Sequence, residues 1–442
     1  MRSLTILISC IVVASLLFLF VFNQKTEDRS DQPTKLRFVS LAWQEQALAT
    51  NHSIVDEWNA LHPEIQVDYV QGSWNSIYDY LITSFETGDV PDVFHYESGI
   101  IVDFAVRGYL TNLAPMLSDD TKHDILDIAW SSVTRSNGEV VGIPFLIESL
   151  VTLYNRDAFE QARIVAPTAS NPWTWDELMS NAKHLTKDID GDGNIDQWGV
   201  GIGLRSSANI IMNLSISFGG SYFYRENNSY VVRVGEPERK LLNVIHRSLY
   251  YDNSAAPSSI GQTGANMLPG FMSGKFAMLV GIGAWARQQL VENAPKSFRW
   301  GVIPPLKAEN QNTGISTQTL SIPKKSKRQK EAMAFIEFML NSQNAARLAK
   351  SDWMLPARKS CLAMKEFNTS PDGWDVVTNG VRFLKTGSWL GVPGYVEWKS
   401  RVVNPMLQEL FANRLSVDEA ARRIEVESNI VLQRHQMRDP QW

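Results

Sequence analysis

Apolar and polar positions follow two different periods along the first hundred residues, and together they predict alternating strands and helices. Residues 36–41 and 65–70 form short apolar or alternating runs that predict strands, and residues 92–95 predict a third strand. Between them, residues 46–61 and 77–87 carry apolar side chains at helical spacing. Strands that alternate with helices predict an α/β fold whose strands are joined by crossover helices.

The middle of the chain predicts a passage from one sheet to a second one. Asn137 and Gly138 form a pair that accepts the positive φ angles of a tight turn. An apolar run at 139–145 predicts a strand, and a second apolar run follows at 150–154. Only a short polar patch that contains Glu148 separates the two runs. We therefore expect Glu148 to lie where the chain crosses between two sheets.

The later elements complete a second unit and then return to the first one. Thr174 is a suitable N-cap for a helix at 176–185. A strand at 300–306 is expected to return to the first lobe, where a helix at 331–340 packs. The segment from residue 353 onward is expected to be mostly helical and to lie on the second lobe.

The N-terminus indicates export. Residues 4–22 form an uncharged run of 19 residues. A helix of that length spans roughly 28 Å, close to the thickness of a bilayer core. Two interpretations stay open for residues 1–23, a cleaved signal peptide and an uncleaved membrane anchor. Residues 24–34 are polar and predict a linker, so the rest of the chain is expected in the periplasm or on the extracellular face of the cytoplasmic membrane.

Composition excludes several classes of function. A chain of 442 residues is too long for one ordinary core, which favours two domains. The net charge of −5, with both signs interspersed, provides no basic face for nucleic acid. Only Cys10 and Cys361 occur, and Cys10 lies in the apolar N-terminal run, so neither a disulfide within a domain nor a Cys-x-x-Cys zinc site is expected.

One acidic loop predicts a metal site. Its spacing resembles an EF-hand calcium loop, with side-chain oxygens at positions 1, 3, 5 and 9 and a glycine at position 6. The oxygen-bearing residues are Asp188, Asp190, Asp192, Asn194 and Asp196. Gly199 stands at position 12, where a bidentate glutamate is usual. The sequence leaves two interpretations open, a structural calcium ion and an Asp/Gly-rich turn whose side chains cap their own backbone. No other cofactor is expected.

Five segments resemble landmarks of one protein family. The first is a G-x-P strand end followed by an acidic residue and a Tyr-Asn-Arg-Asp helix entry (142–157), and the second is Gly-Asp-Val-Pro-Asp-Val-Phe followed by Gly-Tyr-Leu-Thr-Asn-Leu (88–94 and 108–113). The third is Phe-Met-Ser-Gly-Lys-Phe-Ala-Met with Trp285 (271–285). The last two are Trp-Gly-Val-Ile-Pro-Pro (300–305) and the helix at 330–340. In their order along the chain they resemble the bacterial extracellular solute-binding proteins of the maltose-binding type, from about Lys35 to the C-terminus.

This resemblance implies an α/β fold of two lobes, the type II periplasmic-binding-protein fold, in which several crossover strands join the lobes. The expected N-terminal lobe comprises residues 35–145 plus 302–350, and the expected C-terminal lobe comprises 146–301 plus 351–442. The resemblance further implies a monomer that captures a carbohydrate, such as an oligosaccharide, in the interlobe cleft. It would deliver this carbohydrate to the permease subunits of an ABC importer and would carry no catalytic activity.

Candidate ligand-binding residues come from the resemblance and from the rule that ligands bind beyond the carboxyl ends of strands. Sugars offer C–H faces for stacking and hydroxyls for hydrogen bonds, so aromatic and polar side chains are both needed. The resemblance indicates Tyr96, Glu148, Trp285 and Trp398. Further candidates are Trp43, Gln44, Trp74, Glu97, Trp353, Trp389 and Tyr395.

Two alternative functions remain at this stage. The anchor-length N-terminus is compatible with a membrane-tethered sugar sensor that informs a signalling partner. The carboxylates of Glu97 and Glu148 could in principle act as the acid and base of an exported glycoside-acting enzyme, although nothing in the sequence fixes their separation.

Overall fold

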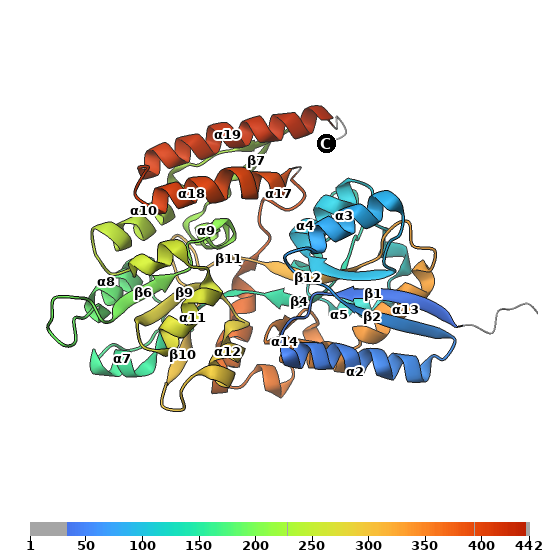
Figure 1. Cartoon of the computed structure of the whole chain (residues 1–442), viewed down its shortest axis with the longest axis horizontal. Helices are drawn as coiled ribbons and strands as arrows, with labels where there is room; N and C mark the ends of the chain where they lie inside the picture. Colours follow the sequence, from blue (N-terminus) through green and yellow to red (C-terminus); the bar gives the residue numbers. More distant parts are fainter. Residues whose placement is uncertain (1–32, 228, 393, 439–442) are drawn as a thin grey trace, which may run out of the picture.

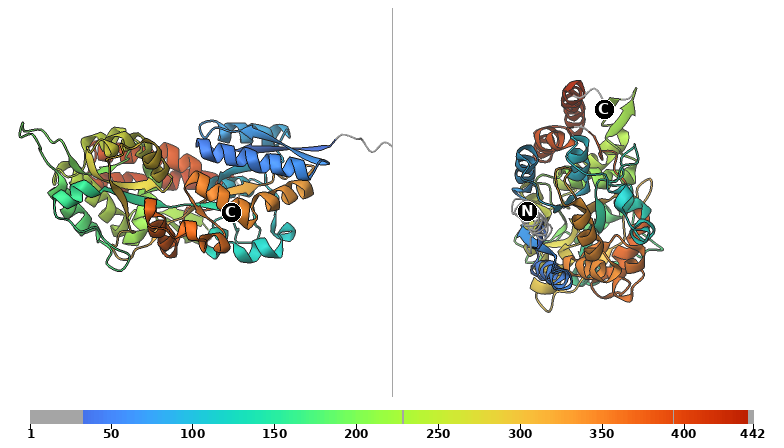
Figure 2. Two further views of the ribbon diagram at one scale, coloured as in Figure 1. Left: turned by 90° about the horizontal axis from the view of Figure 1, so that it is seen from below. Right: turned by 90° about the vertical axis from the view of Figure 1, so that its right-hand side faces the viewer.

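The computed structural model describes residues 33–227, 229–392 and 394–438, which form two α/β lobes (Figure 1). The left view of Figure 2 shows the lobes side by side, with the N-terminal blue segments in one and the green and yellow segments in the other. The expected signal peptide or anchor at 1–23 lies outside the described residues. Within the described part of the chain, no helix combines the length and the apolar character that crossing a membrane requires.

The first lobe is built on a six-stranded sheet in the order β13-β4-β12-β3-β1-β2. Its strands are β1 (Thr34–Ser40), β2 (Ile65–Gln71), β3 (Val93–Glu97), β4 (Ile143–Glu148), β12 (Ser316–Ser321) and β13 (Leu355–Pro356). Strand β1 pairs in parallel with β2 and β3, as expected for strands joined by crossover helices, whereas β12 runs antiparallel to both β3 and β4. The parallel part brings the carboxyl ends of β1 and β3 to the same edge.

The second lobe is built on a four-stranded sheet in the order β10-β5-β9-β6. Its strands are β5 (Leu150–Asn155), β6 (Trp198–Ile202), β9 (Phe276–Gly283) and β10 (Trp300–Ile303). Every residue of β9 is buried, which explains its continuous apolar sequence. Two small sheets pair β7 (Phe223–Glu226) with β8 (Ser229–Val232), and β11 (Thr313–Gly314) with β14 (Leu384–Lys385).

The helices cover both sheets. Those of the first lobe are α2 (Glu45–Leu61), α3 (Ile77–Thr87), α4 (Ser98–Val106), α5 (Asp119–Asp124), α6 (Asp127–Trp130), α13 (Gln329–Met339), α14 (Ser342–Asp352) and α15 (Lys359–Leu362). Those of the second lobe are α7 (Arg156–Gln161), α8 (Trp175–Leu185), α9 (Ala208–Ser215), α10 (Glu236–Tyr250), α11 (Gly264–Met272), α12 (Ala286–Asn293), α17 (Tyr395–Trp398), α18 (Asn404–Phe411) and α19 (Val417–Arg438). Helix α16 (Trp374–Gly380) packs beside β10. The expected N-cap is confirmed, because the Thr174 hydroxyl accepts a hydrogen bond from the Glu177 amide at the start of α8.

The chain crosses between the lobes at β4 and β5, as the sequence predicts. Strand β4 ends at Glu148 in the first sheet, and β5 begins at Leu150 in the second sheet. The strand predicted at 139–145 begins later, at Ile143, and extends to Glu148 itself. A single residue, Ser149, therefore connects the two sheets.

Two of the expected boundaries differ from the structure. Residues Trp300–Ile303 pair with β5 in the second sheet, so the chain returns to the first sheet only at β12 and not at residue 302. The sequence of a short apolar strand is compatible with either sheet, and only its hydrogen-bonded partner determines which sheet it joins. The segment after residue 350 is also divided, because β13 pairs with β4 in the first sheet. The part from Trp389 onward, with α18 and α19, packs into the core of the second lobe (Figure 1).

Candidate ligand-binding site between the lobes

Two tryptophans meet where the lobes face each other. Trp43 follows the carboxyl end of β1, and Trp285 follows the carboxyl end of β9. Their ring centroids lie 5.6 Å apart and their planes are inclined by 80°. Trp43 keeps 45% of its surface exposed, so this large apolar side chain still offers a ring surface to solvent. The pair therefore combines an aromatic group from each lobe at one place.

The segment that carries Trp43 is held by side chains of the first lobe. The Leu41 amide donates to Nδ1 of His95 (3.1 Å), and the Leu41 carbonyl accepts from the Trp74 indole (3.0 Å). His95 is buried, and this burial lowers its pKa to about 4, so the ring is neutral at physiological pH. Its Nε2 lies 2.9 Å from the amide oxygen of Gln318 on β12. The neutral ring thus fixes the chain just before Trp43.

Glu148 contacts the second lobe through Trp285. A Cβ atom placed on Gly283 would lie 2.2 Å from the indole Nε1 of Trp285 and 2.9 Å from Oε1 of Glu148. Both side chains therefore cover the same glycine backbone, and only glycine leaves room for them. Burial, together with the negative charges of Glu97 and Asp352, raises the pKa of Glu148 to about 7, and the hydrogen bond from the Trp285 indole opposes this shift.

A second carboxylate, Asp352, lies buried at the end of α14. Burial raises its pKa to about 6, and a hydrogen bond from the Gln44 amide partly offsets this effect. The Nε2 atom of Gln44 lies 3.1 Å from both the carboxylate and the backbone carbonyl of Asp352. Gln44 is itself buried and follows Trp43 directly. This hydrogen-bonded pair joins α14 to the end of β1.

A further contact between the lobes involves α17 and the beginning of α4. The Lys399 ammonium lies 3.9 Å from Oε1 of Glu97, which is the last residue of β3. The same ammonium lies 5.4 Å from the centre of the Tyr395 ring. Tyr395 is buried beside Gly99, and its hydroxyl donates to Oδ1 of Asn209 (3.3 Å). We call the residues between the lobes the interlobe site, which comprises Trp43, Gln44, Glu97, Glu148, Trp285, Asp352, Tyr395 and Lys399.

The remaining predicted residues lie elsewhere. Tyr96 and Trp74 stack on each other in the first lobe with centroids 5.8 Å apart, and Trp74 is 38% exposed. Trp353 is partly buried and stacks on Trp374 at 5.5 Å, beneath the Arg287 guanidinium. Trp389 is buried in the core of the second lobe.

Trp398 does not occupy the position expected for a ligand-stacking residue. Its exposed fraction is 0%, and its indole donates to the Ser428 hydroxyl of α19 at 2.7 Å. Phe223 and Tyr395 cover the ring at centroid distances of 4.6 Å and 5.8 Å. The position therefore contradicts the expected stacking role and indicates a core residue that joins α17 to α19.

Asp352, Lys399 and Gln288 were not predicted from the sequence. Asp352 and Lys399 each stand next to a tryptophan that was singled out, and this was the only local signal. Gln288 lies one helical turn after Trp285 on α12 and is 1% exposed. Long-range packing alone brings these polar side chains toward the boundary between the lobes.

Residues 42–346 match the family model of the bacterial extracellular solute-binding proteins. The chain belongs to this family. This solute-binding protein is 39% identical over 386 residues to an uncharacterised lipoprotein of Streptomyces antibioticus from the region 5′ of oleD. The match covers 87% of this chain and 84% of the relative. It is 24% identical over 293 residues to a maltooligosaccharide ABC transporter solute-binding lipoprotein of Streptococcus pneumoniae serotype 4, covering 65% of this chain and 64% of the relative.

A solved structure confirms the expected two-lobed type II fold. The ABC substrate-binding protein Lmo0181 from Listeria monocytogenes, in complex with cycloalternan, superposes on this solute-binding protein with a TM-score of 0.76. The match covers 91% of this chain and 100% of that chain at 22% sequence identity. The family consists of extracellular solute-binding proteins, in agreement with the export predicted from the N-terminus, and the Streptococcus and Listeria proteins are likewise binding proteins rather than enzymes.

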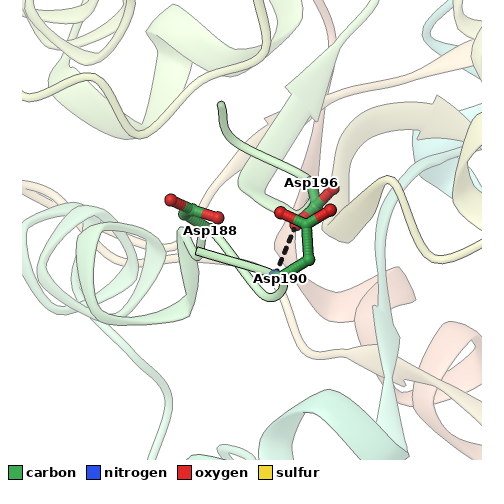
Figure 3. Close-up of side chains that lie close together, drawn as sticks. All are labelled: Asp188, Asp190 and Asp196. Carbon is green, nitrogen blue, oxygen red and sulfur yellow. Dashed lines mark hydrogen bonds between the residues drawn. The ribbon is translucent and has the colours of Figure 1, made fainter. Parts of the chain in front are cut away.

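The acidic loop of this solute-binding protein brings three of its five predicted ligands together. Carboxylate oxygens of Asp188, Asp190 and Asp196 lie within 4.8 Å of one another on the exposed surface (Figure 3). The loop also satisfies its own backbone, because Asp188 accepts from the amides of Gly191 (2.7 Å) and Gly193 (2.8 Å). Both glycines have positive φ angles, as a tight acidic loop requires.

The other two predicted ligands interact with each other. Oδ1 of Asp192 accepts from the Asn194 amide at 2.7 Å, and Oδ2 of Asp192 accepts from Nδ2 of Asn194 at 3.0 Å. The donor set is made of hard oxygens that suit calcium, and the same hydrogen bonds also fit a turn that caps itself. Both interpretations of the loop therefore remain consistent with its geometry.

A cavity of about 760 Å³ lies in a different part of the solute-binding protein, along the outer edge of β10. Its lining includes Tyr154, Trp300, Asp372 and Phe383 and none of the residues of the interlobe site. A cavity beside an edge strand of the second sheet does not combine groups from the two facing strand ends. The interlobe site, and not this cavity, brings together side chains that follow strands of both sheets.

Proposed function

We propose that this protein captures a carbohydrate between its two lobes outside the cytoplasm and delivers it to the permease of an ABC importer. The observation that carries this proposal is the Trp43–Trp285 pair, in which each lobe supplies one aromatic ring. Aromatic rings bind the C–H faces of a sugar, and the neighbouring carboxylate of Glu148 can bind its hydroxyls. The names of the maltooligosaccharide and cycloalternan relatives support the same class of ligand.

The connection between the lobes supports a mechanism of closure. Ser149 alone separates β4 from β5, so a small backbone rotation there changes how the lobes face each other. A ligand that touches both lobes binds the closed form more tightly than the open form, and this difference shifts the population toward closure. The closed form then offers a composite surface, made by both lobes, to the permease.

The protein acts as a monomer under this proposal and binds its ligand without changing it chemically. Its N-terminal apolar run directs it across the cytoplasmic membrane, either as a cleaved signal or as an anchor. A sugar would therefore leave the protein with the same covalent structure that it had on binding.

The test follows melting temperature and tryptophan fluorescence of the full-length chain, purified in a mild detergent, across monosaccharides and oligosaccharides. A true ligand raises the melting temperature in proportion to the logarithm of its concentration, because it binds only the folded state. Mass spectrometry of the recovered saccharide should show an unchanged mass. A panel in which no saccharide shifts either signal would contradict the proposal, and hydrolysis of a bound oligosaccharide would indicate an enzyme instead.

A further inference from the structure

The interlobe site carries more negative than positive charge. Glu97, Glu148 and Asp352 are close enough for the first and third to act on the charge of Glu148. Among the residues that the structure describes, Lys399 forms an ion pair with this group, and its ammonium lies 3.9 Å from Oε1 of Glu97. Over the described parts of the chain, neither Glu148 nor Asp352 forms an ion pair with a lysine, arginine or histidine. The half-buried Glu148 and the buried Asp352 are thus left without a compensating charge.

The amide groups of this region add further acceptors. Gln44 and Gln288 are 3% and 1% exposed, and the Oε1 atoms of both have no hydrogen-bond partner among the described residues. Their Nε2 atoms are already used, because Gln44 donates to Asp352 and Gln288 donates to Glu292 at 2.9 Å. These bonds fix the orientation of each amide, since only the nitrogen can donate to a carboxylate. The site therefore has acceptors in excess, and a buried acceptor without a donor is unfavourable.

The chemistry that best matches this excess is a cationic amine. An ammonium group brings three donors and no acceptor, whereas a sugar hydroxyl brings one donor and two acceptor lone pairs. Hydrogen bonds between an ammonium and a carboxylate are shorter and stronger than those between neutral groups. The neighbouring Trp43 and Trp285 rings also attract a cation through their negative faces.

We propose that the ligand is an amino sugar, a saccharide with a free primary amine whose ammonium group lies among Glu97, Glu148 and Asp352. This inference rests on the proposed capture of a carbohydrate and specifies its class. The sugar ring contacts Trp43 and Trp285, and the ammonium supplies the positive charge that Glu148 and Asp352 lack. The raised pKa values of Glu148 and Asp352 in the absence of ligand agree with carboxylates that have no neighbouring cation to stabilise their negative charge.

The experiment compares saccharides that differ only in one substituent. Isothermal titration of the full-length chain at pH 7 uses glucosamine against glucose, galactosamine against galactose, and chitosan oligosaccharides against cello-oligosaccharides and fully N-acetylated chito-oligosaccharides of the same length. We expect at least one free amine to bind about tenfold or more tightly than its matched neutral saccharide, as charge-assisted hydrogen bonds allow.

Variants locate the amine. Glu148→Gln and Asp352→Asn keep the size of the side chain and remove its charge, so each should reduce the ratio of the amine's affinity to that of its matched neutral saccharide about tenfold. Asp68→Asn changes an exposed carboxylate on β2 and serves as the control, because it should leave the preference unchanged. Circular dichroism and melting curves establish that each variant is folded.

The outcomes separate the inference from the proposed function. Neutral saccharides that bind as tightly as their amine counterparts would overturn the amino-sugar inference and leave carbohydrate capture intact. A preference for the amine that both charge-removing variants retain would also overturn it, because the ammonium would then lie elsewhere. If no saccharide of either kind binds, carbohydrate capture fails and the inference fails with it.

Discussion

Glu148 and Trp285 cover the same glycine, Gly283, although they come from strands of different sheets. Glu148 ends β4 of the first lobe, whereas Trp285 follows β9 of the second lobe. A Cβ atom on Gly283 would come within 2.9 Å of Oε1 of Glu148 and even closer to Nε1 of Trp285. The absence of a side chain at Gly283 thus allows the two lobes to place a carboxylate and an indole side by side.

This relationship predicts the effect of a single added methyl group. Gly283→Ala should displace both the Trp285 ring and the Glu148 carboxylate and should weaken ligand binding by about 1–3 kcal/mol, which is typical of overpacking. Titration with the tightest saccharide measures this loss. Gly261→Ala is the matched control, because a Cβ atom at Gly261 has no other atom within 4 Å. Equal affinities of the two variants would show that this contact does not position the site.

Trp398 should contribute to stability rather than to binding. Its ring is fully buried among Phe223, Tyr395 and α19, so Trp398→Ala should lower the free energy of unfolding by about 3–5 kcal/mol. Denaturant unfolding with and without saccharide separates the two roles. A variant that unfolds like the wild type and binds more weakly would restore Trp398 to the ligand site.

Stability without ligand should depend on pH through Glu148 and Asp352. Burial raises the pKa of Glu148 from 4.5 to about 7 and that of Asp352 from 3.8 to about 6. Between about pH 4 and pH 7, the folded state therefore binds more protons than the unfolded state. The stabilisation that protonation of Glu148 and Asp352 gives the folded state is fully present below the pKa values of the unfolded chain. It is lost as the pH rises through 6 to 7.

Glu148→Gln should remove part of this pH dependence. The variant should resemble the wild type near pH 4 and be more stable at pH 8, by at most about 3 kcal/mol, because one pKa unit corresponds to about 1.4 kcal/mol. Denaturant unfolding at both pH values checks the expectation, and the exposed-site variant Asp68→Asn serves as the control. A difference between Glu148→Gln and the wild type that is the same at both pH values would contradict the assigned shift.

The acidic loop predicts stabilisation by calcium. If Asp188, Asp190 and Asp196 hold an ion, calcium should raise the melting temperature of the wild type and Asp190→Ala should abolish this increase. Asp176→Asn alters a carboxylate in the first turn of α8, outside the loop, and should respond to calcium like the wild type. Identical melting of the wild type in calcium and in chelator would show that the loop only caps its own backbone.

Much of the fold could be predicted from local patterns. The alternation of strands and helices, the N-cap at Thr174 and the crossing beside Glu148 depend on residues close together in sequence, and the structure contains each of them. The pairing of Trp300–Ile303 could not be predicted this way, because hydrogen bonds with distant β5 decide it. A short apolar strand carries no information about which sheet it joins.

The candidate site likewise contains residues that local sequence predicts and residues that only long-range packing brings there. Trp43, Gln44, Glu97, Glu148 and Trp285 follow or end strands, where ligands are expected on α/β sheets, and the structure brings them to the boundary between the lobes. Trp398 lies on a short helix whose position depends on packing against α19, so its burial had no local signal. Asp352 and Lys399 likewise reach the site through helices that are far along the chain from β1 and β3.

The most direct test of the account compares Trp43→Ala and Trp285→Ala by titration with the tightest saccharide. Each variant removes an aromatic ring from one lobe, and Tyr251→Ala, at a residue that is 72% exposed, controls for the loss of an aromatic side chain. Capture between the lobes predicts that both tryptophan variants lose about 1–3 kcal/mol of binding while the control loses none. Wild-type affinity in either tryptophan variant would contradict a ligand that bridges the two lobes.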